Sequence, residues 1–146
     1  YDRLLELYGQ HGLFVERMDN VSCPGANGFE TMKMIMQTLR DTPPKEIGDE
    51  KVTALLDYQS SERRDIATGE VTPIDCIKNN TIAIELGDSR RLVVVRPSGT
   101  EPKMKFYVMW HEESKSQDLG EIEEQFTQVE RELEGLSREL AGLVLE

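Results

Sequence analysis

The sequence predicts an α+β fold with a mainly antiparallel sheet and helices packed on one face of it. Most predicted strands follow one another between residues 52 and 110, with helices before and after, so the chain lacks the regular strand-helix alternation of a parallel sheet. Residues 81–86 and 91–96 are rich in β-branched residues and flank the turn formers that begin at Gly87, which indicates a hairpin. Hydrophobic residues make up 38% of the chain, enough for one core.

The first residues predict a short helix followed by an extended segment. Four apolar residues recur at helical spacing: Tyr1, Leu4, Leu5 and Tyr8. Gly9 ends this run, and no capping residue precedes it, so we expect the chain to be part of a longer one. Residues 13–15 predict a short strand, and the turn formers at 19–28 predict a linker.

The central part of the chain predicts one amphipathic helix and several strands. Residues 29–40 place four apolar side chains on one helical face, which we interpret as core packing: Phe29, Met32, Met36 and Leu39. Pro43 and Pro44 end this helix. The polar residues 57–75 predict a long loop or an irregular hairpin. Four strands are predicted, at residues 52–56, 81–86, 91–96 and 104–110.

The last predicted element is a long amphipathic helix. Its apolar stripe runs through Leu119, Ile122, Phe126, Val129, Leu133, Leu136, Leu140 and Leu143, and acidic residues fill the other faces. The stripe predicts a helix that lies across the sheet. Because its spacing also has a heptad period, a coiled-coil or dimer seam is the alternative, and with it a non-catalytic interaction module as a second function.

The charge distribution argues against several classes of partner. A formal net charge of −11 disfavours general electrostatic attraction to nucleic acid or an anionic membrane. No apolar run is long enough to span a bilayer and no signal peptide is recognisable, so we expect a soluble, cytoplasmic protein. The acidity is uneven, because residues 112–146 carry a net charge of −8 whereas residues 90–105 carry +4. This basic segment is the sharpest local signal.

The cysteines and histidines predict no metal site. Cys23 and Cys76 are interpreted as two reduced thiols, although the sequence leaves a disulfide between them open. No second Cys or His stands at metal-ligand spacing near either one, so zinc is not expected. His11 and His111 are isolated and are interpreted as ordinary surface or loop histidines.

The segment Arg-Pro-Ser-Gly-Thr-Glu-Pro-Lys at 96–103 lies between two predicted strands and offers several groups to an anion. Arg96 can present a planar fork of donors to two phosphate oxygens. Ser98 and Thr100 add hydroxyl donors, and Gly99 permits a positive φ and a close approach of backbone N–H groups.

The flanking residues support the same interpretation. Pro97 and Pro102 restrict the loop, and Lys103 and Lys105 raise the local positive potential. The alternative is a polar hairpin loop whose hydroxyls only satisfy backbone groups, with Arg96 paired to Glu101.

This loop, with the Lys-Phe-Tyr run at 105–107 after it, resembles the phosphate-binding loop in the last domain of the α-D-phosphohexomutases, the phosphoglucomutase/phosphomannomutase family. Residues 57–75, with Asp-Tyr at one end and Thr-Pro-Ile-Asp at the other, are similar to the bacterial branch. Residues 43–48 resemble the beginning of that domain, and residues 4–15 resemble the end of the domain before it. The resemblance implies that 1–27 are the tail of a preceding domain and a linker, and that 28–146 are the C-terminal, phosphate-binding domain.

The resemblance implies an enzyme of the isomerase class, an intramolecular phosphotransferase of carbohydrate metabolism. It would interconvert hexose 1-phosphate and hexose 6-phosphate through a phosphoserine and a hexose 1,6-bisphosphate intermediate. The serine loop, the aspartate-rich Mg²⁺ loop and the sugar loop of the family have no counterpart in this sequence and would lie in three other domains. We therefore expect no catalytic residue and no metal ligand here, and an isolated chain that is monomeric and inactive.

The resemblance also assigns roles within the loop. It makes Arg96, Ser98, Gly99 and Thr100 the contacts to the substrate phosphate. Glu101 is expected to brace the loop, and Lys103 and Lys105 are expected to help electrostatically. Because the sugar loop is absent, the sequence does not indicate whether glucose or mannose phosphate is preferred.

Overall fold

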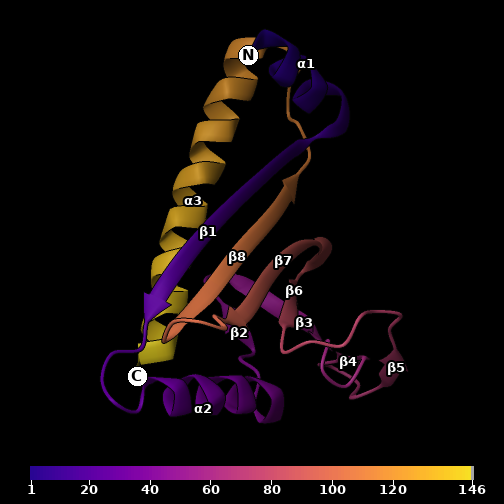
Figure 1. The fold of residues 1–146 in the computed structure, drawn as a ribbon. Helices are drawn as coiled ribbons and strands as arrows, with labels where there is room; N and C mark the ends of the chain where they lie inside the picture. Colours follow the sequence, from indigo (N-terminus) through magenta and orange to yellow (C-terminus); the bar gives the residue numbers. More distant parts are fainter. Residues whose placement is uncertain (146) are drawn as a thin grey trace.

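The computed structural model describes residues 1–145, and the side chains of all of these except 88, 89 and 143–145. Its elements follow in the order α1 (Asp2–His11), β1 (Leu13–Ser22), α2 (Gly28–Asp41), β2 (Glu46–Ile47), β3 (Glu50–Asp57), β4 (Glu62–Asp65), β5 (Val71–Pro73), β6 (Ile82–Leu86), β7 (Asp88–Pro97), β8 (Lys103–Glu112) and α3 (Leu119–Leu145) (Figure 1).

One antiparallel sheet organises the molecule. Its strands lie in the order β1-β8-β7-β6-β3-β4-β5, and the short β2 pairs with β3. Every strand pairing among the described residues is antiparallel, and β3–β4–β5 and β6–β7–β8 are consecutive hairpins. The α+β class with a mainly antiparallel sheet is therefore confirmed.

All three helices lie on one face of this sheet, as predicted. The inward-facing residues of β1, β6, β7 and β8 join apolar residues of α2 and α3 in one buried cluster. Figure 1 shows α3 running diagonally behind β1 and β8, while α2 lies below the strand ends. Helix α1 packs on α3, where the rings of Tyr8 and Phe126 stack with centroids 5.5 Å apart. The opposite face of β1, β8 and β7 is left uncovered by the described helices.

The apolar stripe of α3 is buried by this packing. Five of its residues are buried within the chain: Ile122, Val129, Leu133, Leu136 and Leu140. Leu119 and Phe126 are half-buried, and the side chain of Leu143 lies outside the described part. The prediction of a helix across the sheet is confirmed, and the coiled-coil alternative finds no free apolar seam among the described side chains.

Several local predictions are corrected. Residues 19–22, expected in a linker, form the end of β1, which pairs with β8 along its whole length from Leu13 opposite Glu112 to Ser22 opposite Lys103. Of the two alternatives for residues 57–75, the hairpin is confirmed, because β4 and β5 pair there and extend the sheet. Phe29, expected in the core with Met32, is 51% exposed.

His111 also differs from its prediction as a surface or loop residue. It lies in β8 and is only 4% exposed, and the centroid of its ring lies 4.5 Å from the centroid of the Phe14 ring. A Cβ on Gly12 would stand 2.5 Å from its Nε2, so the glycine permits this close packing. His111 is buried because β1 pairs with β8 and covers it, and this long-range pairing is not visible in the local sequence. His11 is exposed, as predicted.

Candidate anion-binding site

The loop at 98–102 is a compact turn between β7 and β8. The Ser98 N–H donates to the Lys103 carbonyl at 2.8 Å, and the Lys103 N–H donates to the Glu101 carbonyl at 2.8 Å. The Thr100 N–H lies 3.5 Å from Ser98 Oγ, which accepts from it. Ser98 is only 8% exposed, whereas Gly99 and Thr100 are exposed. Ser98 therefore holds the turn, and Gly99 and Thr100 present it to solvent.

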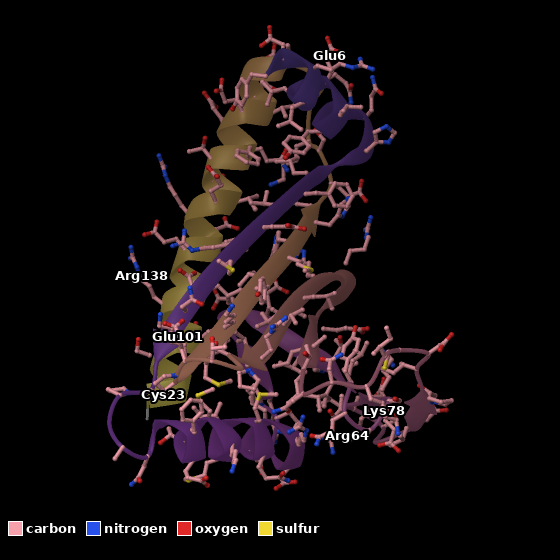
Figure 2. The ribbon with its side chains drawn as sticks, viewed as in Figure 1. Glu6, Cys23, Arg64, Lys78, Glu101 and Arg138 are labelled. Carbon is pink, nitrogen blue, oxygen red and sulfur yellow. The ribbon has the colours of Figure 1, made fainter. Side chains whose placement is uncertain are left out.

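The segment before α2 anchors this turn. The Cys23 N–H donates to the Pro102 carbonyl at 2.7 Å. A Cβ on Gly28 would lie 2.2 Å from the Cys23 carbonyl oxygen and 2.8 Å from Pro102 Cβ, so only glycine fits there. Figure 2 shows Cys23 and Glu101 near each other at this end of the sheet. The loop is thus tied to the start of α2 as well as to its own strands.

Arg96 and Lys105 are brought together on the uncovered face. They stand opposite each other in the β7–β8 ladder. Their neighbours Val95 and Phe106 are buried in the core, so alternation along each strand directs Arg96 and Lys105 to the other side. Within the described part of the chain, neither side chain takes part in a hydrogen bond or ion pair. Two adjacent cations therefore remain available to an anion.

The other lysine of this region is placed differently. Lys103 Nζ forms an ion pair with Glu101 at 3.2 Å, which is compatible with the predicted bracing of the loop by Glu101. Arg96 is not the partner of Glu101, as the alternative interpretation required. Lys103 and Lys105 were both predicted as electrostatic helpers; among the described residues Lys103 is paired and Lys105 is not.

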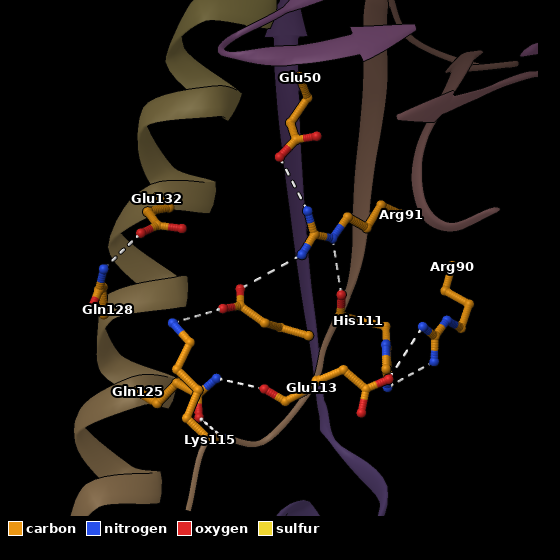
Figure 3. Close-up of polar contacts among 10 residues, drawn as sticks. Glu50, Arg90, Arg91, His111, Glu113, Lys115, Gln125, Gln128 and Glu132 are labelled. Atoms are coloured by element: carbon orange, nitrogen blue, oxygen red, sulfur yellow. Dashed lines mark hydrogen bonds and ion pairs between the residues drawn. The ribbon is translucent and has the colours of Figure 1, made fainter. Parts of the chain in front are cut away.

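The cations of the basic segment 90–105 also differ along its length in whether they have a partner. Arg91 donates to Glu50 at 3.1 Å and to the His111 carbonyl at 3.0 Å (Figure 3). Its guanidinium also lies 4.5 Å from the centroid of the Trp110 ring. Arg90 Nη2 lies 3.4 Å from Glu113 Oε1; both residues are drawn in Figure 3. At a rise of about 3.3 Å per residue, these arginines stand roughly 17–20 Å from Arg96 along β7. Among the described cations of this segment, only Arg96 and Lys105, at its loop end, have no hydrogen-bond or ion-pair partner.

Gly99 has a different conformation from the one predicted. The described glycines with positive φ are at positions 12, 25, 48, 69 and 87, and Gly99 is not one of them. A Cβ at Gly99 would meet no atom within 4 Å. The glycine therefore leaves open space above the turn rather than enabling a left-handed backbone.

Asn20 is a candidate that sequence reasoning missed. It lies opposite Lys105 in the β1–β8 ladder and is exposed, so Asn20, Lys105 and Arg96 form one row across three strands. Residue 20 fell in a predicted linker, and no local pattern could have joined it to a strand so distant in sequence. Its amide can donate and accept hydrogen bonds on the same face as the two cations.

Other chemistries find less support in the described residues. No group of three or more His, Cys, Asp or Glu side chains among them could hold a metal ion. Cys23 and Cys76 are free thiols, and burial raises the pKa of the Cys23 thiol. No helix in the described part of the chain is both long enough and apolar enough to cross a bilayer.

An α+β domain that presents two unpaired cations beside an exposed, tightly anchored turn has the features of an anion-binding domain. Comparison with known proteins identifies the family to which this domain belongs. The family described as phosphoglucomutase/phosphomannomutase, C-terminal domain, matches residues 45–129, and the chain belongs to this family. The resemblance drawn from the loop is thereby confirmed.

The similar proteins agree with this assignment. A phosphoglucomutase of Staphylococcus aureus strain MRSA252 is 34% identical over 107 residues, which cover 73% of this chain and 19% of that protein. The phosphoglucomutase of strain N315 is 33% identical over the same coverage. The open form of parafusin, a Paramecium phosphoglucomutase, covers 90% of this chain and 22% of its own at 14% identity, with a TM-score of 0.40, too low to carry an argument. The chain spans about a fifth of the length of the curated relatives it matches.

Proposed function

We propose that this domain grips the phosphate of a hexose phosphate within a larger phosphohexomutase. The enzyme would interconvert hexose 1-phosphate and hexose 6-phosphate through a phosphoserine and a hexose 1,6-bisphosphate. The observation that carries the proposal is that Arg96 lies opposite Lys105 and that neither has a partner among the described side chains, beside the turn through which the chain resembles the mutases.

The absence of an internal partner distinguishes Arg96 from most arginines of the described part of the chain. The sequence has 28 Asp and Glu against 17 Lys and Arg, and most arginines of the described part donate to a carboxylate or a carbonyl. Arg96 and Lys105 lie side by side without such a partner in the part of the chain that the structure describes. A phosphate placed between them would supply the missing negative charge, and charge-assisted hydrogen bonds to it are stronger than neutral ones.

The roles within the site follow from its geometry. Arg96 supplies a planar fork of donors and Lys105 a second positive charge. Thr100 supplies a hydroxyl and Gly99 the open space for close approach, while Ser98 fixes the turn. These groups recognise the phosphate rather than the sugar. They therefore suit an enzyme that must hold its substrate in two orientations, with the phosphate on either carbon.

The remaining chemistry is assigned to other parts of the enzyme. We propose that the phosphoserine and the Mg²⁺ that assists phosphoryl transfer belong to the three other domains, and that the isolated chain is inactive. Binding of the remote phosphate would then help to orient the substrate and to close the domains around it. We place the enzyme in the cytoplasm.

We also propose that residues 1–27 are the tail of the preceding domain and a linker to residues 28–146. The pairing of β1 with β8 then has a consequence for the site. The tail would complete the sheet of the C-terminal domain and bring Asn20 next to Lys105, so the position of the linker would affect the phosphate site directly.

A titration of the isotope-labelled chain tests the phosphate site. Inorganic phosphate, glucose 1-phosphate and glucose 6-phosphate are each added while backbone amide signals are followed by NMR. All three should shift the signals of residues 96–100, with Kd in roughly the millimolar range, about −4 kcal/mol, and weaker binding at higher salt.

Arg96→Ala should abolish these shifts, whereas Arg131→Ala, at an exposed position on α3, should leave them unchanged. If the sugar phosphates shift signals elsewhere and those of Ser98, Gly99 and Thr100 stay in place, the assignment of this loop is wrong.

A further inference from the structure

The row of side chains that contains Arg96 continues across the sheet beyond β7. In the antiparallel β6–β7 ladder Val95 stands opposite Ile82, so Arg96, the next residue, stands beside Thr81. The Tyr58 N–H, directly after β3, donates to the Thr81 carbonyl at 3.0 Å. Thr81 and Tyr58 therefore lie one and two strands away from Arg96, on the side opposite β8.

The side chains of Thr81 and Tyr58 point to the uncovered face of the sheet. Their chain neighbours Asn80 and Asp57 both accept hydrogen bonds from the Arg40 guanidinium of α2, at 2.6 and 3.0 Å. Asn80 and Asp57 are thus directed to the face that the helices cover. Because side chains alternate between the two faces along extended chain, Thr81 and Tyr58 are directed to the other face, which carries the candidate phosphate site.

These hydroxyls extend a set of polar groups that have no partner within the described chain. No hydrogen bond or ion pair of the described residues involves the hydroxyl of Thr81, the phenol of Tyr58 or, at the far end of the row, the side-chain amide of Asn20. The same holds for the two cations between them. We call this set the polar row: Asn20, Lys105, Arg96, Thr81 and Tyr58.

The polar row is bordered by an apolar one. Over β3, β6 and β7, the adjacent row on this face consists of Leu56 opposite Ala83 and Ala83 opposite Val94. These three residues stand two positions from Tyr58 and its neighbours in the polar row, so they share its face. On these strands, the hydrogen-bonding groups are therefore gathered at the end of the sheet that carries the turn at 98–102.

We propose that Thr81 and Tyr58 hold the hydroxyl-bearing part of the substrate whose phosphate is bound by Arg96 and Lys105. This inference rests on the proposed function. The chemistry of the row changes along its length, because two cations suit a phosphate, whereas two neutral hydroxyls both donate to and accept from sugar hydroxyls.

The spacing of the row fits such a ligand. Tyr58 stands two strands from Arg96, roughly 10 Å away, since neighbouring strands lie about 4.8 Å apart. A pyranose ring joined to a phosphate covers this span once the side chains at both ends reach toward it. Because each hydroxyl can act as donor or acceptor, Thr81 and Tyr58 can bind the ring in either of two orientations.

A comparison of two anions tests the inference on the isotope-labelled chain. Inorganic phosphate should shift the backbone amide signals of residues 96–100 and leave those of Tyr58 and Thr81 in place. Glucose 1-phosphate should shift both groups of signals. It should also bind about three- to tenfold more tightly than inorganic phosphate, the gain expected from one or two neutral hydrogen bonds in water.

Substitutions that remove only the hydroxyls give a sharper test. Tyr58→Phe and Thr81→Val should each weaken the binding of glucose 1-phosphate and leave the Kd of inorganic phosphate unchanged, a difference that a merely structural role would not produce. The matched control is Tyr107→Phe, at a half-buried tyrosine opposite Val94 in the adjacent row of the same face. It should change neither Kd.

The outcomes separate this inference from the proposed function. Equal Kd values for the two anions in the unsubstituted chain, or Tyr58 and Thr81 signals that glucose 1-phosphate does not move, would overturn the inference and leave the phosphate site intact. Full preference for glucose 1-phosphate in both Tyr58→Phe and Thr81→Val would overturn it as well. If inorganic phosphate failed to shift residues 96–100, the proposed function itself would be rejected, and this inference with it.

Discussion

Arg96 lies directly opposite Lys105 in the β7–β8 ladder, and the two side chains leave the sheet on the face away from the core. The outward direction of each side chain follows from the alternation along its own strand, but the proximity of the two side chains depends on the register of the hairpin. A one-residue slip would turn one of them toward the core. The turn at 98–102, closed by the bond from the Ser98 N–H to the Lys103 carbonyl, holds that register.

Removal of the Arg96 guanidinium should damage the full-length enzyme strongly. Arg96→Ala is expected to reduce kcat/KM by about 2–4 kcal/mol, because a charge-assisted contact is lost and the phosphate is left under-paired. Arg96→Lys should recover only part of the loss, since an ammonium cannot reproduce the planar fork. Steady-state kinetics measure kcat/KM. A kcat/KM of Arg96→Ala within about twofold of that of the unsubstituted enzyme would reject Arg96 as a phosphate ligand.

The two lysines after the loop should differ in their effect on phosphate binding. Lys105→Ala should weaken phosphate binding by about 1–2 kcal/mol, roughly 5- to 30-fold, because this cation has no partner in the described chain. Lys103→Ala should weaken it by less than about threefold, since the ammonium is already paired with Glu101. The NMR titration measures both, and equal losses would contradict the distinction.

Two glycines near the loop should respond in opposite ways to the same substitution. Gly99→Ala should change the free energy of unfolding by no more than about 0.5 kcal/mol, because its Cβ would meet open space and its φ is not positive. It should nevertheless weaken phosphate binding, since the methyl group would fill the space above the turn.

Gly28→Ala should instead destabilise the fold by about 1–3 kcal/mol through its clash with the Cys23 carbonyl. Urea denaturation separates the pair. A Gly99→Ala variant that binds phosphate normally would show that the open space is not used.

The α3 stripe should stabilise the monomer. Leu133→Ala is expected to cost about 2–5 kcal/mol of unfolding free energy, because the side chain is 1% exposed in the core. Arg131→Ala, on the exposed side of the same helix, should change the unfolding free energy by less than about 0.5 kcal/mol. Light scattering should show a monomer at micromolar concentration. A stable dimer that dissociates in Leu133→Glu would support the coiled-coil interpretation.

The two thiols should react at different rates. Burial raises the pKa of Cys23, which leaves less thiolate at neutral pH, and its 2% exposure also limits access. Cys76 is half-buried in the segment after β5. Iodoacetamide at pH 7.5 should therefore label Cys76 well before Cys23, and both should react alike in urea. Equal rates in the native chain would contradict the burial of Cys23.

Local sequence patterns sufficed for the elements that depend on periodicity. The stripes of α2 and α3, the hairpin of β6 and β7 and the loop at 96–103 are each encoded within a short window, so their type was predicted correctly. The α+β class follows from the order of these elements, and the family follows from the residues of the loop.

The sequence by itself therefore determined the helices and the strands β3, β6, β7 and β8, the apolar faces of α2 and α3, and which loop resembles a mutase phosphate site. Tertiary structure alone decided which charges remain free: Arg91 is neutralised by Glu50, 41 positions away, while Arg96 meets no carboxylate in the described chain. It also decided that residues 19–22 join the sheet and that Asn20 stands beside Lys105. The physical reason is that periodicity specifies the face of an element but not its neighbour, whereas ion pairing and strand pairing depend on residues that the chain brings together only when it folds.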